Sequence, residues 1–135
     1  MKTDLLELLI KKAREVSENA YSVYSNFPVG AAFIDKKGNI YTGCNVENKS
    51  FGLTNCAERT AIFHAISKGC RSIDTLVVYT PTNSPTPPCG ACRQVITEFS
   101  HDAKIICVCD SDKIIETTIN ELIPCSEFPV DLRKG

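Results

Sequence analysis

Three cysteines and one glutamate have the residue types and the spacing of a metal site. Cys89 and Cys92 are separated by two residues in the stretch PPCGACRQV, and Cys56 is followed two positions later by Glu58. A Cys-x-x-Cys pair at the start of a helix suits a redox dithiol, half of a structural zinc site, or two ligands of a catalytic metal. The pair by itself leaves these three alternatives open.

Cys56 favours the catalytic metal. It is expected to begin a second helix, and two such helices packed on one face of a sheet would bring three thiolates to one point. Three protein ligands leave the fourth tetrahedral position of zinc to water, whereas a structural site uses four. The fourth ligand of a structural site would have to come from the cysteines outside both motifs, none of which has Cys-x-x-Cys spacing: Cys44, Cys70, Cys107, Cys109 and Cys125.

Glu58 and Arg59 are candidates for proton transfer and charge balance at such a site. A carboxylate beside a zinc ligand can take and return the proton of an activated water. The pattern Asn55-x-x-Glu58 is also close to a helix capping box, which is the structural alternative. Three thiolates give a zinc site a charge of about −1, and an arginine that donates to the sulfurs would offset it. Arg59 is the nearest candidate and Arg93 a weaker one, and a solvated surface arginine is the alternative for Arg59.

Composition and charge exclude several classes of protein. The chain has 135 residues and a net charge of −1, and its 15 basic residues are dispersed along the sequence. Nucleic acids and acidic membranes attract a basic stripe, so neither is an expected partner. The N-terminus is too charged for a signal peptide, and no apolar run is long enough to span a bilayer. We therefore expect a single cytoplasmic domain over 1–135, with reduced cysteines.

The expected elements alternate between helices and strands and would position these groups. Hydrophobic periodicity and turn residues predict a helix over 4–20, a hairpin over 29–46, a helix from an Asn55 N-cap to Gly69, a strand over 75–80, a helix over 89–99, a strand over 104–110, an antiparallel strand over 114–118 and a short helix over 118–124. This order predicts a three-layer α/β/α fold with one mixed sheet of roughly five strands.

CAERTAI at 56–62 followed by PCGACRQV at 88–95 resembles the small homotetrameric zinc cytidine deaminases, and the resemblance covers nearly the whole chain. It implies hydrolytic deamination of free cytidine and 2′-deoxycytidine in pyrimidine salvage, with one zinc ion per chain. By the same resemblance Cys56, Cys89 and Cys92 hold the zinc, which activates the water that attacks C4 of the pyrimidine, and Glu58 is the proton shuttle. A homotetramer is likewise implied.

Two upstream segments resemble those that bind the nucleoside. SNFPVGAAF places Phe27 beside the base, and GCNVENKSFG places Asn45 and Glu47 on the ribose hydroxyls. The resemblance adds Ala57 to the residues that bind the substrate. An amide and a carboxylate two residues apart at a strand end point the same way, which suits the binding of a sugar hydroxyl. Without the zinc motif, a polar loop and an ordinary core phenylalanine would be the preferred interpretations.

The sequence departs from the usual family pattern at four positions. Lys49 stands where a small residue is usual, Val23 where proline is common and Pro87 where serine is common. Phe128 lies one residue later than the aromatic that family members often extend into a neighbouring active site. No catalytic group is lost, so these departures bear on which base or sugar fits. The alternatives are a deaminase for a modified cytosine nucleoside such as blasticidin S, a redox dithiol protein, and a non-catalytic zinc module.

Overall fold

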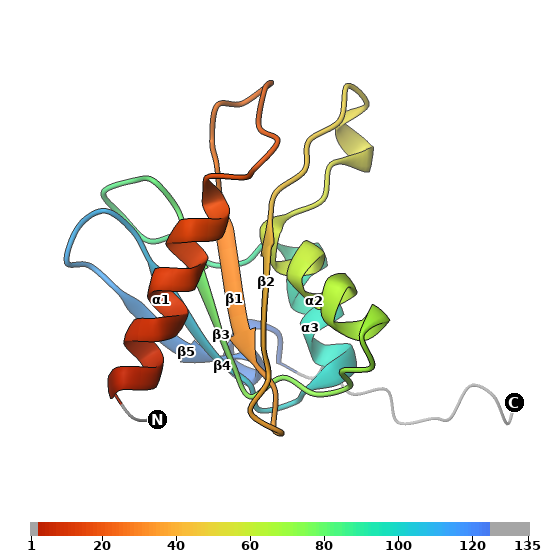
Figure 1. Ribbon diagram of the computed structural model, residues 1–135, viewed down its shortest axis with the longest axis vertical. Coiled ribbons are helices and arrows are strands. Elements are labelled where there is room, and N and C mark those ends of the chain that lie inside the picture. Colours follow the sequence, from red (N-terminus) through yellow and green to blue (C-terminus); the bar gives the residue numbers. More distant parts are fainter. Residues whose placement is uncertain (1–2, 125–135) are drawn as a thin grey trace, which may run out of the picture.

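A five-stranded mixed sheet lies at the centre of the protein (Figure 1). The computed structural model describes residues 3–124. The strands lie in the order β2-β1-β3-β4-β5; β3 and β4 pair in parallel and the other neighbours are antiparallel. Their bounds are β1 Gly30–Ile34, β2 Ile40–Cys44, β3 Thr75–Tyr79, β4 Lys104–Val108 and β5 Ile115–Thr118.

Helices cover both faces of this sheet, which confirms the predicted three-layer α/β/α architecture. Helix α1 (Thr3–Ser17) covers one face, and α2 (Ala57–Ser67) and α3 (Gly90–Phe99) lie side by side on the other (Figure 1). A short 3-10 helix, η1 (Phe51–Leu53), precedes α2, and α4 (Ile119–Leu122) follows β5. Within the described range of 3–124, no helix has the length and apolarity that crossing a membrane requires.

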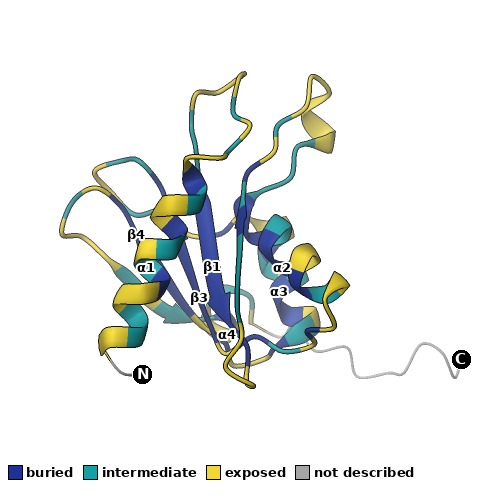
Figure 2. Ribbon diagram, viewed as in Figure 1, coloured by how far each residue is buried: buried dark blue, intermediate teal, exposed yellow. Residues whose placement is uncertain are grey.

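Strand β1 is buried along its whole length (Figure 2). It separates two apolar clusters, one on each face of the sheet. Because successive strand residues face opposite sides, Ala32 packs in the cluster under α1, while Phe33 packs in the larger cluster under α2 and α3. Glycines allow both helices to approach closely. A Cβ atom on Gly30 would overlap the backbone of α1 at Ala13, and one on Gly43 would overlap the backbone of α2.

Several helix boundaries differ from those predicted by one to three residues: α1 ends at Ser17 and not at residue 20, and α2 ends at Ser67 and not at Gly69. The differences at the starts of α2 and α3 concern the candidate ligands. Helix α2 begins at Ala57 with Cys56 as its N-cap, not with Asn55. The reason is that the backbone N–H and C=O of Asn55 both bond to Val46, each at 2.9 Å, in an isolated β-bridge. The Asn55–Glu58 capping box is therefore not formed. Helix α3 likewise begins after its N-cap, Cys89.

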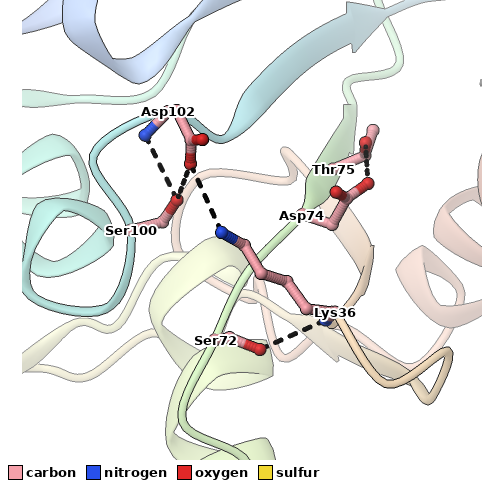
Figure 3. Close-up of polar contacts among 6 residues, drawn as sticks. All are labelled: Lys36, Ser72, Asp74, Thr75, Ser100 and Asp102. Atoms are coloured by element: carbon pink, nitrogen blue, oxygen red, sulfur yellow. Dashed lines mark hydrogen bonds and ion pairs between the residues drawn. The ribbon is translucent and has the colours of Figure 1, made fainter.

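Polar contacts join the loops at one end of the sheet (Figure 3). The Lys36 side chain, which follows β1, lies 3.8 Å from Asp102, and its backbone N–H donates to the Ser72 hydroxyl at 3.1 Å. The ion pair is largely exposed and contributes about 0–1 kcal/mol. Ser72 and Asp102 precede β3 and β4, so these contacts lie at the end of the two strands opposite the candidate site.

Candidate active site

The N-terminal ends of α2 and α3 bring three cysteine thiols together. Cys56 caps α2, Cys89 caps α3, and Cys92 lies in the first turn of α3. The sulfurs of Cys56 and Cys89 are 3.7 Å apart, and all three sulfurs lie within 4.8 Å of one another. Zinc–sulfur bonds of about 2.3 Å at tetrahedral angles place sulfurs about 3.8 Å apart. The three thiols therefore fit one zinc ion.

The other cysteines do not complete a four-cysteine site within residues 3–124. Cys44, Cys70, Cys107 and Cys109 are free thiols, and none belongs to the metal-ligand group. Cys125 lies outside the described residues. Burial also raises the pKa of Cys107 to about 12, as expected for a core thiol without a ligand role. The described ligand set thus leaves the fourth zinc position open, as in catalytic sites.

Arg59 balances the charge of this cluster. Its Nη2 donates to the sulfur of Cys56 at 3.4 Å. A hydrogen bond with Cys92, aided by Arg59, lowers the pKa of Cys56 to about 5, so this sulfur is a thiolate at neutral pH. Arg93, the weaker candidate, makes different contacts. Its guanidinium donates to the carbonyl oxygens of Pro88 at 2.8 Å and Leu122 at 2.9 Å.

Glu58 lies in the first turn of α2, lines the pocket beside the thiols and is 5% exposed. Burial is the largest cause of a raised pKa, about 7, and the nearby Cys56 thiolate raises it further. A carboxyl group with a pKa close to neutral can both accept a proton and release it. The Asn55–Glu58 capping box is not formed; the Glu58 carboxyl bonds instead to its own backbone N–H and to Cys92, which places it beside the thiols.

A pocket of about 230 Å³ opens beside the thiols. It is smaller than the roughly 300–1,000 Å³ of sites for drug-sized ligands, which suits one small ring. Six of its lining residues were predicted as site residues: Phe27, Asn45, Cys56, Ala57, Glu58 and Cys89. Pro87 also lines it. Val78 and Thr80, at the carboxyl end of β3, were missed; the carboxyl end of a parallel strand is the signal that could have indicated them.

Asn45 fixes the segment that carries Phe27. Its amide Nδ2 donates to the Phe27 carbonyl oxygen, and its Oδ1 accepts from the Val29 backbone N–H, both at 2.9 Å. The side chain is buried, with the residue 8% exposed. An amide engaged in this way retains one N–H and one lone pair for a ligand. Asn45 therefore shapes the pocket wall in addition to lining it.

Glu47 lies in a neighbouring hollow and not in the pocket of Asn45. Its carboxylate accepts hydrogen bonds from the backbone N–H groups of Tyr24 at 3.0 Å and Ser25 at 3.1 Å, and from the Ser25 hydroxyl. The Ser25 hydroxyl is the main cause of a lowered pKa for Glu47, which keeps it ionised. Thr54 lines both hollows, so the two are adjacent. Asn45 and Glu47 thus lie in two adjacent hollows that share Thr54 as a lining residue.

The fold and the site together define a class of protein. Cys-x-Glu and Pro-Cys-x-x-Cys at two helix starts, with three thiols around one point and a buried glutamate beside them, are the arrangement of zinc-dependent nucleobase deaminases. The model of the cytidine and deoxycytidylate deaminase zinc-binding region matches residues 3–109, and the chain belongs to this family.

Individual relatives are similar over most of their length. A cytidine deaminase of Sporosarcina psychrophila is 48% identical over 128 residues, which cover 94% of each chain. A cytidine deaminase of Halalkalibacterium halodurans is 48% identical over 119 residues, covering 87% of this chain and 90% of that one. The crystal structure of cytidine deaminase from Burkholderia pseudomallei superposes with a TM-score of 0.86 at 40% identity, over 93% of this chain and 98% of that one.

Three of the departures from the family pattern either do not line the pocket or lie outside the described residues. Val23 and Lys49 are exposed. Phe128 lies outside residues 3–124, so its contact with a neighbouring site stays a prediction. Pro87 alone among the four departures lines the pocket within this range, which makes it the departure that bears on substrate choice.

Proposed function

We propose that this protein catalyses the hydrolytic deamination of cytidine and 2′-deoxycytidine to uridine and 2′-deoxyuridine. The observation that carries the proposal is the juxtaposition of the buried Glu58 carboxyl with the cluster of three thiols, two of which line the same small pocket as Glu58. Cys56, Cys89 and Cys92 would hold one zinc ion. Membership of the deaminase family supports the reaction type.

The residues around the pocket have separable tasks in this reaction. Zinc bound by the three thiolates would supply Lewis-acid activation of the attacking water. Glu58 would relay the two protons of the attacking water, one to ring nitrogen N3 and one to the departing amine, because its pKa of about 7 allows it both to accept and to release a proton. Its burial keeps bulk water away from the transferred proton. Arg59 holds the Cys56 sulfur and offsets the thiolate charge.

Substrate recognition would use the remaining predicted residues. Phe27 packs against the base, and Ala57, the first residue of α2, offers a backbone N–H that has no acceptor within its own helix. Glu47, held ionised by Ser25, accepts from a ribose hydroxyl, and Asn45 both contacts the sugar and positions Phe27. The charge of Glu47 and the absence of a basic stripe favour a free nucleoside over a polynucleotide.

Family membership also supports a proposal for the organisation and the cellular role of the protein. We propose one catalytic domain over 1–135, a homotetramer, and a role in cytoplasmic pyrimidine salvage. Large apolar side chains near the pocket are exposed on the single chain, as an assembly surface requires: Val46, Phe51, Leu53 and Phe63.

Replacement of Glu58 by Ala tests the proposed mechanism. Zinc should remain stoichiometric because the three thiols are intact, while kcat on cytidine should fall by about 10²–10⁴ or more. Glu98, an exposed glutamate on α3, provides the matched control, and Glu98→Ala should leave turnover unchanged. Zinc content is measured by metal analysis, and turnover by the loss of ultraviolet absorbance. Full activity in Glu58→Ala would contradict the mechanism.

A modified cytosine nucleoside such as blasticidin S is the second candidate substrate, and the observation behind it is Pro87 in the pocket wall. A panel of cytosine nucleosides compared by kcat/KM separates the two. A redox dithiol would leave Glu58 and the third thiol without a role. Loss of cytidine turnover on treatment with a chelator, and its recovery on adding zinc, separates the deaminase from that alternative and from a non-catalytic zinc module.

A further inference from the structure

Hydroxyl groups form a short chain that leads from the pocket wall into the loop after β3. Thr80 lines the pocket together with Glu58 and is 3% exposed. The oxygen of its hydroxyl lies 3.1 Å from that of Thr82. The Thr82 hydroxyl in turn donates to the backbone carbonyl oxygen of Ser84 at 2.7 Å.

The direction of these hydrogen bonds is fixed by the number of hydrogens. A threonine hydroxyl has one hydrogen and two lone pairs, and a carbonyl oxygen can only accept. The single hydrogen of Thr82 goes to Ser84, so the hydrogen between Thr80 and Thr82 must come from Thr80. Within residues 3–124 no other side-chain contact engages the Thr80 hydroxyl. The Thr80 hydroxyl can therefore accept a hydrogen bond from a ligand, but it cannot donate one, because its hydrogen is already bonded to Thr82.

Backbone contacts hold this chain in place. The N–H of Thr80 donates to Val108 in β4 at 3.1 Å, and the N–H of Asp110 donates to the carbonyl oxygen of Thr82 at 2.8 Å. The Ser111 hydroxyl donates to the carbonyl oxygen of Asn83 at 2.7 Å. Because these bonds hold the loop in place, the Thr80 hydroxyl keeps Thr82 as the acceptor of its hydrogen.

We propose that Thr80 is a specificity-determining residue, whose hydroxyl oxygen accepts a hydrogen bond from the exocyclic amino group of a cytosine nucleoside and disfavours the carbonyl oxygen that replaces that group in the product. The inference rests on the proposed function and deepens it. Substrate and product differ at C4, where a donor becomes an acceptor. Pro87, in the same pocket, has no backbone N–H, so it adds no donor there either. An acceptor at Thr80 thus favours the amino group of cytidine over the carbonyl group of uridine.

The test compares the affinities of cytidine and uridine by calorimetry. A Glu58→Gln background prevents turnover, so both dissociation constants can be measured on the zinc-loaded protein. One hydrogen bond corresponds to a change of about three- to tenfold in a dissociation constant. In Thr80→Val, the preference for cytidine over uridine should fall by that factor, and in Thr80→Ser it should be retained.

A second variant tests the direction of the hydrogen bond. Thr82→Val removes the group that accepts the hydrogen of the Thr80 hydroxyl. That hydroxyl can then donate to the C4 carbonyl oxygen of uridine, so uridine should bind about three- to tenfold more tightly. This variant decides the question if Thr80→Val does not fold. Thr97 supplies the control: it is 4% exposed, its hydroxyl bonds to the Gln94 carbonyl oxygen at 2.7 Å, and it lies in α3. Thr97→Val should leave the preference unchanged.

The remaining outcomes separate failure of this inference from failure of the proposed function. An unchanged preference in Thr80→Val, or unchanged uridine affinity in Thr82→Val, overturns it while leaving the proposed function intact if the wild-type protein turns over cytidine. Absence of turnover in the wild-type protein, with the affinity changes present, overturns the proposed function and leaves the role of Thr80. Absence of binding of either nucleoside overturns both.

Discussion

Arg93 is expected to hold the pocket wall and the zinc ligand Cys89 in position from outside the pocket. Its guanidinium donates to the carbonyl oxygen of Pro88, the residue before Cys89, and to that of Leu122 at the end of α4. Replacement by Gln shortens the side chain and removes the charge, so both carbonyl groups lose their donor. The change should therefore affect stability and zinc binding together.

The size of the effect follows from the two hydrogen bonds. A hydrogen bond to a charged group contributes about 1.5–3 kcal/mol, and partial exposure of Arg93 places each at the lower end, so the free energy of unfolding should fall by about 3 kcal/mol. For a chain of 135 residues this lowers Tm by roughly 10 °C. Differential scanning calorimetry measures the shift, and competition with a chelator measures zinc affinity, which should fall by about tenfold or more.

Arg71 provides a matched control. It also donates to two backbone carbonyl oxygens, those of Ile66 at 3.1 Å and Cys70 at 2.7 Å, but it is exposed and lies beyond the C-terminal end of α2. Arg71→Gln should cost about 1 kcal/mol or less and leave zinc affinity and KM unchanged. Equal zinc affinity in the two variants would refute the positioning role of Arg93, whatever their stabilities.

Three further predictions concern the pocket, the core and pH. Pro87→Ser should change the ratio of kcat/KM between cytosine nucleosides more than it changes zinc affinity, and the reverse result would count against a role in substrate choice. Gly43→Ala should lower stability by about 3 kcal/mol and weaken zinc binding, because its Cβ would overlap Ala61 and push α2 from the sheet; an unaltered denaturant midpoint would contradict this. Ser25→Ala should raise the pKa of Glu47 towards its ordinary value of 4.5, since the serine hydroxyl is the largest cause of the lowering. A carboxyl pKa that is lower in the folded than in the unfolded state stabilises the folded protein above about pH 4.5, and this stabilisation is lost as the pH falls through the lowered value. The Ser25→Ala variant should lack this contribution. NMR titration of the Glu47 carboxyl measures the shift in its pKa.

The sequence by itself determined the class of fold and the set of candidate zinc ligands. Strand and helix periods follow from local side-chain patterns, so the alternation of elements, the antiparallel return of β5 and the three layers could be predicted and are confirmed. Cys56, Glu58, Cys89 and Cys92 could be singled out because metal chemistry depends on residue type and close spacing, which a sequence displays directly.

The start of α2 was decided by a contact between segments distant in sequence. Asn55 has the residue type of an N-cap, but its backbone is committed to Val46, so Cys56 takes that place and Glu58 is released from a capping role. Local propensity cannot include such a bond, because it reflects only neighbouring residues.

Tertiary structure alone decided which groups share the pocket and which way their hydrogens point. Arg59 and Arg93 are both arginines that follow a zinc-ligand motif, yet one donates to sulfur and the other to carbonyl oxygens. Thr80 and Thr82 are unremarked in the sequence, and only their distances to each other and to the Ser84 carbonyl group order the hydroxyl hydrogens. Hydrogen bonds are short-range and directional, so they become defined only when the folded chain sets positions to within a few tenths of an ångström.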